Sequence, residues 1–273
     1  SKPADRMRVL LAVWAAKLTA ALLRVLGRQG THVPGIVARR IHPGIIGAVR
    51  HPARVVAVTG TNGKTTVSNL LAEALLGEGM RVASNRSGSN LAAGIAWALI
   101  AAVDWRGRPR ADVGVLELDE RSGRLVLPGL HPDVLVCTNL TRDSIKRNAH
   151  PEYIAWILSS ELAADTMLVL NADDLIASSL GGESNPRVHF AVERLPGDTE
   201  TPTGAALDAM TCPVCDQLLA WDYWRFNHIG RAHCPACGFR SPDAAYRARD
   251  IDAAASRLVL GLDGDAREAR LVN

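Results

Sequence analysis

The sequence has 273 residues, of which 48% are apolar and 22% are charged, as in an ordinary globular protein. This length provides core for one large domain or two smaller ones. The net charge of +3 comes from 31 basic and 28 acidic residues mixed along the chain, which is too weak to indicate a nucleic-acid surface. Four of the five cysteines form two Cys-x-x-Cys pairs, a pattern that differs from a dense secreted disulfide framework and suits a reducing compartment.

The first element is a mostly apolar stretch over residues 7–26, interrupted by Arg8, Lys17 and Arg24. A membrane-spanning helix needs about 20 apolar residues with few charges. The stretch therefore predicts an amphipathic helix packed on the protein or on a partner. The alternative is a helix that lies on a membrane surface with its basic residues toward lipid headgroups.

The following residues alternate between strand and helix patterns. Residues 27–52 predict a linker with a short helix at about 36–40. Strands are expected at 54–58, 81–84, 112–118, 133–137, 166–170 and 188–191, and helices at 65–76, 90–103 and 151–164, the second with Ser89 as its N-cap. This alternation predicts an α/β fold with a mostly parallel sheet. A β-hairpin is expected over 256–272.

A glycine loop follows the first predicted strand and precedes a predicted helix, the geometry that holds the phosphates of ATP. Its residues are Thr59, Gly60, Thr61, Asn62, Gly63, Lys64, Thr65 and Thr66. Lys64 is expected on the β- and γ-phosphates, and the Thr65 hydroxyl on Mg²⁺. The general phosphate-loop pattern has an earlier glycine, whose place Val58 takes here.

A phosphate loop of this kind needs an acidic partner for Mg²⁺ at the end of a neighbouring strand. Glu117 ends the apolar strand pattern at 113–116 and is the best candidate, with Asp119 and Glu120 behind it. A solvated acidic loop is the alternative for all three.

The four paired cysteines predict a structural zinc ribbon. Cys212 and Cys215 are separated by 18 residues from Cys234 and Cys237, and two such turns can direct four thiolates at one tetrahedral ion. A pair of redox dithiols is the alternative. The aromatic and basic run at 221–228 is expected to pack against the ribbon and the adjoining domain, with stacking on nucleic-acid bases as the alternative. Cys137 is expected to be a small buried apolar residue.

Three motifs, in this order, resemble those of the Mur ligases: the loop at 59–66, Thr-Asn-Leu-Thr-Arg-Asp at 138–143 and Leu-Asn-Ala-Asp-Asp at 170–174. Three further features narrow this resemblance to one branch of the Mur ligases. They are the cysteine ribbon, Asn-Arg-Ser-Gly-Ser-Asn-Leu at 85–91 and Leu-Glu-Leu-Asp-Glu at 116–120. Together they are similar to the MurT family, the Mur-ligase subunits of lipid II isoglutaminyl synthase. The implied fold is a phosphate-loop Mur ligase central domain with an inserted four-cysteine zinc ribbon.

The resemblance implies an ATP-dependent carbon–nitrogen ligase of peptidoglycan synthesis. Such subunits activate the α-carboxylate of D-glutamate in lipid II as an acyl phosphate, and ammonia from a glutamine amidotransferase subunit of the GatD type completes D-isoglutamine. The implied cofactors are ATP, Mg²⁺ and Zn²⁺. The implied catalytic residues are Lys64, Glu117, Asn139, Arg142 and Asp143, with Asn171 near the nucleotide. The alternatives are another Mur-superfamily amide ligase of the folylpolyglutamate-synthase type, or a non-catalytic zinc-ribbon interaction module.

The chain departs from the family in two places. The motif that ends at Asp143 continues as Ser-Ile-Lys-Arg instead of His or Gln followed by Leu-Asp-Arg, which weakens the case for a second metal site. The sequence ends at Asn273, without the C-terminal domain of Mur ligases, so weak nucleotide binding and no turnover are expected of this chain alone. The predicted domains are an N-terminal helix and linker at 1–52 and a central domain at 53–273, with the ribbon at about 208–244. A cytoplasmic location is expected, with the inner face of the membrane as the alternative.

Overall fold

The computed structural model describes residues 3–28, 30, 32–86, 89–142, 150–202, 208–252, 257–262 and 265–270. Asp143 and the Ser-Ile-Lys-Arg departure that follows it lie outside these residues. The chain divides into two compact units. Unit 1 comprises Ser1–Val136, Trp156–Met167 and Gly181–Asn185, and unit 2 comprises Cys137–Ala155, Leu168–Leu180 and Pro186–Asn273.

Three helices begin unit 1: α1 (Pro3–Val25), α2 (Val33–Ile41) and α3 (Ile45–Ala48). One face of α1 is buried through small residues such as Ala12, Val13 and Ala16, which let it pack closely against α2. The prediction of a helix packed on the protein is therefore confirmed for this face. α2 covers the short helix predicted at about 36–40, and α3 is a further helix within the predicted linker. No described helix is long and apolar enough to cross a membrane.

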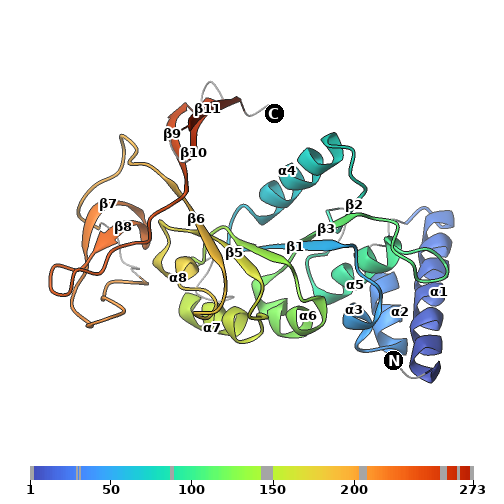
Figure 1. Ribbon diagram of the computed structural model, residues 1–273. Helices are drawn as coiled ribbons and strands as arrows, with labels where there is room; N and C mark the ends of the chain where they lie inside the picture. The colour runs from blue at the N-terminus through green and yellow to red at the C-terminus, as the bar shows by residue number, and fades with distance from the viewer. Residues whose placement is uncertain are drawn as a thin grey trace. The chain divides into compact units, whose positions relative to one another are not determined.

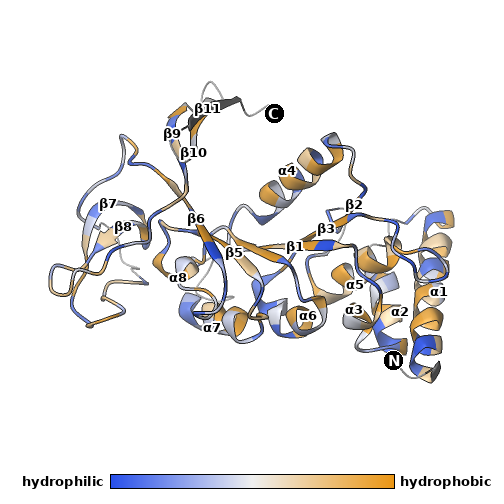
Figure 2. Ribbon diagram, viewed as in Figure 1, coloured by the Kyte–Doolittle hydropathy of each residue, from blue (hydrophilic) through white to orange (hydrophobic). Residues whose placement is uncertain are grey.

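The sheet of unit 1 has the strand order β4-β1-β3-β2. Its strands are β1 (Arg54–Thr59), β2 (Val82–Ser84), β3 (Val113–Glu117) and β4 (Val134–Cys137). β3 pairs in parallel with β1 on one side and with β2 on the other. Hydrophobic residues run along β1 and β3 (Figure 2), as expected for parallel strands covered on both faces.

Helices cover both faces of this sheet: α4 (Lys64–Gly77) lies on one face, and α5 (Ala92–Ala101) and α6 (Gly123–Leu130) lie on the other (Figure 1). Ile95, Leu99 and Ile100 of α5 are fully buried. The assignment of Ser89 as the N-cap of α5 was wrong. Leu91 occupies that position without a side-chain cap, and the Ser89 hydroxyl accepts a 3.1 Å hydrogen bond from the Leu91 amide.

The sequence did not predict α6, which contains Pro128 and two glycines. The glycine at 129 has a tertiary cause, since a Cβ there would lie 3.0 Å from the backbone nitrogen of Gly47 in α3. Glycine at both positions allows the two helices to approach closely. A short 3₁₀ helix, η1 (Glu120–Ser122), leads into α6.

The remaining elements are α7 (Pro151–Ser160), β5 (Met167–Asn171), α8 (Leu175–Ser178), β6 (Arg187–Val192), β9 (Tyr246–Asp252), β10 (Arg257–Leu262) and β11 (Asp265–Arg270). In unit 2, β5, β6 and β9 pair in parallel, and β10 pairs antiparallel with β9 and β11. The predicted C-terminal hairpin is confirmed, whereas β9 was not predicted. The mostly parallel α/β fold class is also confirmed.

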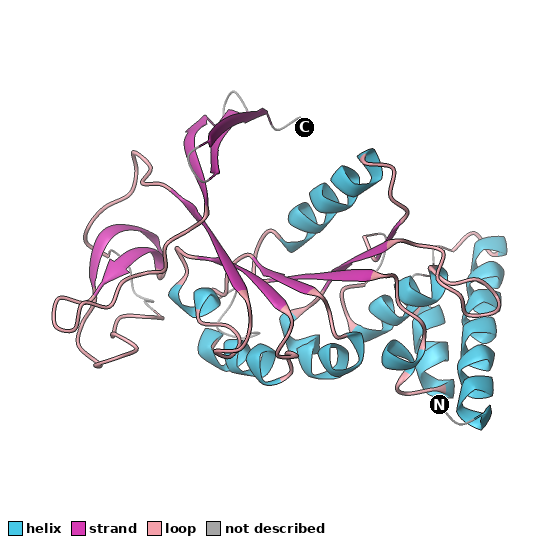
Figure 3. Cartoon of the chain, in the orientation of Figure 1, coloured by secondary structure: helices cyan, strands magenta, loops and turns pink. Residues whose placement is uncertain are grey.

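The cysteine-rich part of unit 2 is built around an antiparallel hairpin of β7 (Ala220–Phe226) and β8 (Ile229–His233). Figure 3 shows these two strands joined to loops on either side. Asn227 makes the turn between them with a φ of 49°. We call the segment from Thr211 to Arg240 the ribbon.

Candidate functional site

The phosphate loop lies between β1 and α4, as the sequence predicts. Gly63 is the N-cap of α4 and has a φ of 81°, a left-handed conformation that favours glycine. The Thr59 hydroxyl, at the end of β1, donates a 3.0 Å hydrogen bond to the Leu118 carbonyl beyond β3. The loop is thereby tied to the strand that carries the acidic residues.

The Lys64 ammonium is held inside the loop. It donates to the Gly60 carbonyl, to the Thr61 carbonyl at 3.1 Å and to Glu120 Oε1 at 3.0 Å. The side chains of Lys64 and Glu120 are each 14% exposed. A largely buried lysine ammonium at a helix N-terminus is a suitable group for binding phosphate.

Glu117 lies next to Thr65, the arrangement that a shared Mg²⁺ requires. The Thr65 hydroxyl donates a 2.8 Å hydrogen bond to Glu117 Oε2, and Asn90 Nδ2 donates to Oε1 at 3.1 Å. Asn85 fixes the backbone of Glu117 from both sides, since its amide accepts from the Glu117 nitrogen and donates to its carbonyl, each at 2.8 Å. The 85–91 motif, which had no role assigned from the sequence, thus orients Glu117.

Glu120 has a more specific place than its sequence suggested. Burial raises the pKa of its carboxyl, and the neighbouring Lys64 opposes that shift. Asp119 instead accepts a 3.1 Å hydrogen bond from the Arg121 amide at the start of η1. The sequence analysis named Glu120 and Asp119 as equal second candidates for binding Mg²⁺. It could not separate them, because which of two neighbouring acids is buried depends on tertiary packing.

In unit 2, the second and third motifs are hydrogen-bonded to each other. Asn171 Nδ2 donates to the Thr138 carbonyl at 3.0 Å, and Asp174 Oδ2 accepts from the Leu140 amide at 2.6 Å. Asn139 lies between these two anchored positions. Arg142 forms an ion pair through its Nε with Asp208, a residue that the sequence did not identify.

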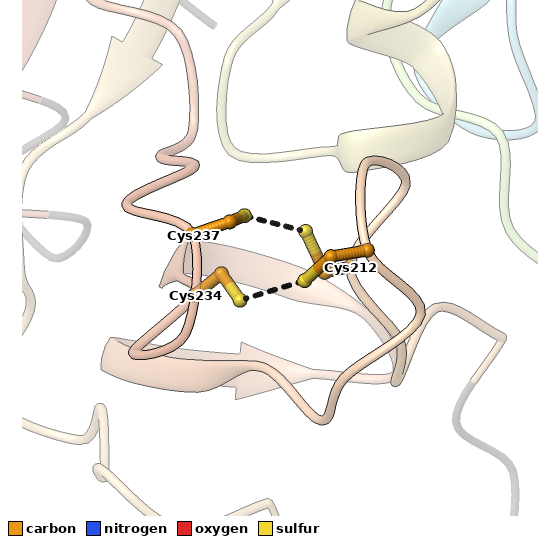
Figure 4. A group of neighbouring side chains, drawn as sticks. Cys212, Cys234 and Cys237 are labelled. Atoms are coloured by element: carbon orange, nitrogen blue, oxygen red, sulfur yellow. Dashed lines mark hydrogen bonds between the residues drawn. The ribbon is translucent and has the colours of Figure 1, made fainter.

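The four ribbon cysteines form a cluster whose sulfur atoms all lie within 4.8 Å of one another. The sulfur atoms of Cys212 and Cys237 face each other at 3.5 Å (Figure 4). Those of Cys215 and Cys234 are also 3.5 Å apart. A tetrahedral ion with metal–sulfur bonds of about 2.3 Å separates its ligands by about 3.8 Å, so the cluster fits a metal. The backbone amide of Cys237 lowers the pKa of the Cys234 thiol, whereas burial and the neighbouring thiols raise the pKa of Cys215 and Cys237.

Most of the aromatic and basic run packs inside unit 2, as the sequence analysis favoured, although Phe226 is 48% exposed. Trp221 and Trp224 are buried with Ala232, and Leu175 packs against them. The Tyr223 hydroxyl donates a 2.8 Å hydrogen bond to Asp173. These rings are therefore not presented for stacking on bases.

A cavity of about 650 Å³ lies beside α1 in unit 1, and it contains none of the predicted site residues. Its lining includes Arg6, Arg50 and Arg106.

Comparison with known proteins agrees with this architecture. Residues 58–193 match the family model "Mur ligase middle domain". The chain is 33% identical, over 91% of its length, to the lipid II isoglutaminyl synthase (glutamine-hydrolyzing) subunit MurT of Staphylococcus aureus strain COL. Residues 58–193 form a Mur ligase middle domain, and the chain as a whole is similar to Mur ligase subunits.

Two further relatives extend the family comparison. The MurT subunit of Streptococcus pneumoniae strain R6 is 27% identical over 88% of this chain. A pseudomurein peptide ligase type C from Methanothermus fervidus is 26% identical, with a TM-score of 0.59 over 82% of this chain and 42% of its own. The chain spans 56% of the Staphylococcus aureus relative and 53% of the Streptococcus pneumoniae relative.

Proposed function

We propose that this chain is the nucleotide-binding part of an ATP-dependent ligase subunit that activates the α-carboxylate of D-glutamate in lipid II. The observation that carries the proposal is the Lys64, Thr65 and Glu117 arrangement, in a chain 33% identical to a MurT subunit over 91% of its length. In this proposal residues 53–273 form the central domain, with a zinc-ribbon insertion at about 208–244 that contains the ribbon segment, and residues 1–52 form the N-terminal helix and linker.

The proposed reaction has two steps. A carboxylate oxygen attacks the γ-phosphorus of ATP, which releases ADP and leaves an acyl phosphate. Ammonia then attacks the carbonyl carbon, phosphate leaves, and D-isoglutamine is formed. The first step requires charge neutralisation and alignment of the phosphates.

Each predicted site residue has a role in this scheme. Lys64 and the backbone of residues 59–66 bind the phosphates, and Thr65 and Glu117 hold Mg²⁺, which neutralises phosphate charge when bound. By the resemblance of their motifs, Asn139, Arg142 and Asp143 are assigned to the acyl phosphate or the substrate carboxylate and Asn171 to the nucleotide; Asp143 lies outside the described residues. Asn139 and Asn171 are supported by the hydrogen bonds that join their two motifs.

The ammonia comes from a glutamine amidotransferase subunit of the GatD type. The support for this partner is the similarity to relatives described as subunits of a glutamine-hydrolyzing synthase. The ion in the cysteine cluster is zinc in a structural role, because four sulfur ligands leave no open position for a substrate.

The protein works in the cytoplasm, and α1 contacts the inner face of the membrane, where a lipid-linked substrate would be. Large apolar residues recur on its exposed face every three or four positions: Met7, Leu11, Trp14, Leu18, Leu22 and Val25. Exposed arginines flank this stripe at both ends: Arg6, Arg8, Arg24 and Arg28. The single acid of the helix, Asp5, is paired with His42. An apolar stripe flanked by arginines suits an anionic lipid surface.

Vesicle sedimentation tests this contact. The protein is expected to sediment with anionic phospholipid vesicles, and Leu18→Glu is expected to abolish this binding. Leu125→Glu, at an exposed leucine of α6, is the matched control and should leave binding unchanged. Equal sedimentation of the protein and Leu18→Glu would refute the contact.

Reconstitution tests the reaction itself. The longer protein that contains this chain is combined with its amidotransferase subunit, ATP, glutamine and lipid II, and the muropeptides are analysed by mass spectrometry. Conversion of D-glutamate to D-isoglutamine, lost in Lys64→Ala, is expected. Glutamate addition to a folate, without amidation of lipid II, would assign a folylpolyglutamate-synthase-type reaction. A non-catalytic module would be favoured if neither reaction occurs while the protein and its Lys64→Ala variant both still bind the amidotransferase subunit.

A further inference from the structure

The turn of the ribbon hairpin is buried against the third motif. His228 directly follows the turn residue Asn227, and its side chain is 0% exposed. Its Nε2 lies 3.0 Å from Oδ1 of Asp174, which is also 0% exposed. Gly230 donates a 2.7 Å backbone hydrogen bond to the Asp173 carbonyl next to it. The ribbon therefore contacts the Asn-Ala-Asp-Asp motif through a fully buried histidine.

Asp174 transmits this contact to the second motif. Its Oδ1 also accepts from the amides of Ile176 and Ala177, at 2.9 Å each, and its Oδ2 accepts from Leu140 at 2.6 Å. A buried carboxylate needs several donors, so each of these groups fixes the position of the others. His228 is the donor that comes from the ribbon.

A second connection runs through Asp208, just before the ribbon. The Asp208 side chain is 2% exposed, and its Oδ2 atom lies 3.8 Å from Nδ1 of His228. Through Oδ1 it forms an ion pair with Arg142 and lies 4.0 Å from His150 Nε2. The imidazole of His228 therefore stands between two buried carboxylates, of which one holds Leu140 and the other holds Arg142.

We propose that His228 and Asp208 are positioning residues that use the ribbon to fix the segment from Thr138 to Arg142. The inference deepens the proposed function and rests on it, because this segment carries Asn139 and Arg142. The ribbon thereby does more than complete the fold of a small insertion. It sets the geometry of the residues that face the reacting carboxylate, and small misplacements of such residues are costly.

The first test measures the segment directly by hydrogen exchange of the intact longer protein. The Leu140 amide donates to Asp174, and His228→Ala removes a side chain that holds this carboxylate in place. Hydrogen exchange at the Leu140 amide is therefore expected to accelerate by at least about tenfold in His228→Ala. His233→Ala is the matched control, since His233 pairs with Asp222 inside the ribbon at 2.8 Å and should leave Leu140 unchanged. Metal content, measured for both variants, should remain that of the parent protein.

The second test separates positioning from nucleotide binding. With the amidotransferase present, His228→Ala and Asp208→Asn are expected to lower kcat by at least about tenfold with the KM for ATP within about twofold. His228→Gln replaces the ring N–H donor with a side-chain amide N–H donor. This variant, once shown to fold with its metal, is expected to restore most of kcat.

Two results would overturn the inference. One is unchanged exchange at Leu140 in His228→Ala, and the other is an equal loss of kcat in His228→Ala and His233→Ala. If the parent protein amidates lipid II and loses that activity in Lys64→Ala, either result refutes the positioning role and leaves the proposed function standing. If the parent protein has no ligase activity, the proposed function fails, and with it the catalytic meaning of any exchange effect.

Discussion

The Thr65 hydroxyl donates a 2.8 Å hydrogen bond to the Glu117 carboxylate, which joins the first turn of α4 to the end of β3. Both residues are expected Mg²⁺ ligands, and they meet because parallel strands β1 and β3 end at the same edge of the sheet. Asn85 and Asn90 hold Glu117 in this place.

Glu117→Gln tests the metal assignment. The substitution keeps the shape of the side chain and its contact with Thr65, but it removes the charge that attracts Mg²⁺. We expect kcat of the reconstituted ligase to fall by about a hundredfold or more and the Mg²⁺ requirement to rise. Asp119→Asn is the control, since Asp119 caps η1. Equal losses in the two variants would contradict the assignment.

Glu120→Gln tests the competition for Lys64. The Lys64 ammonium is paired with Glu120 at 3.0 Å. Neutralising Glu120 should free Lys64 and strengthen ADP binding several-fold, measured by calorimetry. Because burial raises the pKa of Glu120, lowering the pH toward that raised pKa protonates it and releases Lys64. Affinity of the parent protein should therefore rise toward that of Glu120→Gln as the pH falls. A constant difference between the two proteins across pH would contradict this explanation.

Metal removal should unfold the ribbon. Trp221 and Trp224 are buried beside Ala232, so chelation is expected to redshift tryptophan fluorescence and to expose all four thiols to alkylation. Cys212→Ser should cause the same change without a chelator, because the sulfur of Cys212 is buried in the cluster. Unchanged fluorescence and unreactive thiols after complete metal loss would show that the ion is not structural.

Leu99→Ala tests the core of unit 1. Leu99 is fully buried in α5, so the truncation should leave a cavity and lower the free energy of unfolding by about 2–5 kcal/mol, measured by denaturant titration. Leu125→Ala, at an exposed position of α6, should cost much less. Similar losses in the two variants would contradict the burial.

The elements predicted from the sequence are those with a strong local pattern. β1 and β3 are short apolar runs, α4 follows a glycine loop, and the C-terminal hairpin has a turn pair at its centre. The elements that were missed depend on tertiary contacts. The buried residues of α6 do recur at helical spacing, but Pro128 inside it and Gly129, which approaches Gly47 of α3 closely, argue locally against a helix.

The candidate site shows the same division. The identity of Lys64, Thr65 and Glu117 could be predicted because each residue type has a fixed chemical role beside a phosphate. The contacts that orient them could not. Asn85 and Glu117 are joined across 32 positions of sequence, and His228 and Asp174 across 54, so no local pattern records either pair.

The central claim is that the α-carboxylate is activated as an acyl phosphate. Lipid II carrying a heavy-oxygen label in that carboxylate is incubated with the longer protein, its amidotransferase subunit, ATP and glutamine, and the released phosphate is analysed by mass spectrometry. The account predicts that one labelled oxygen passes to phosphate for each amide formed, and that Lys64→Ala abolishes both. Amide formation with unlabelled phosphate would contradict it.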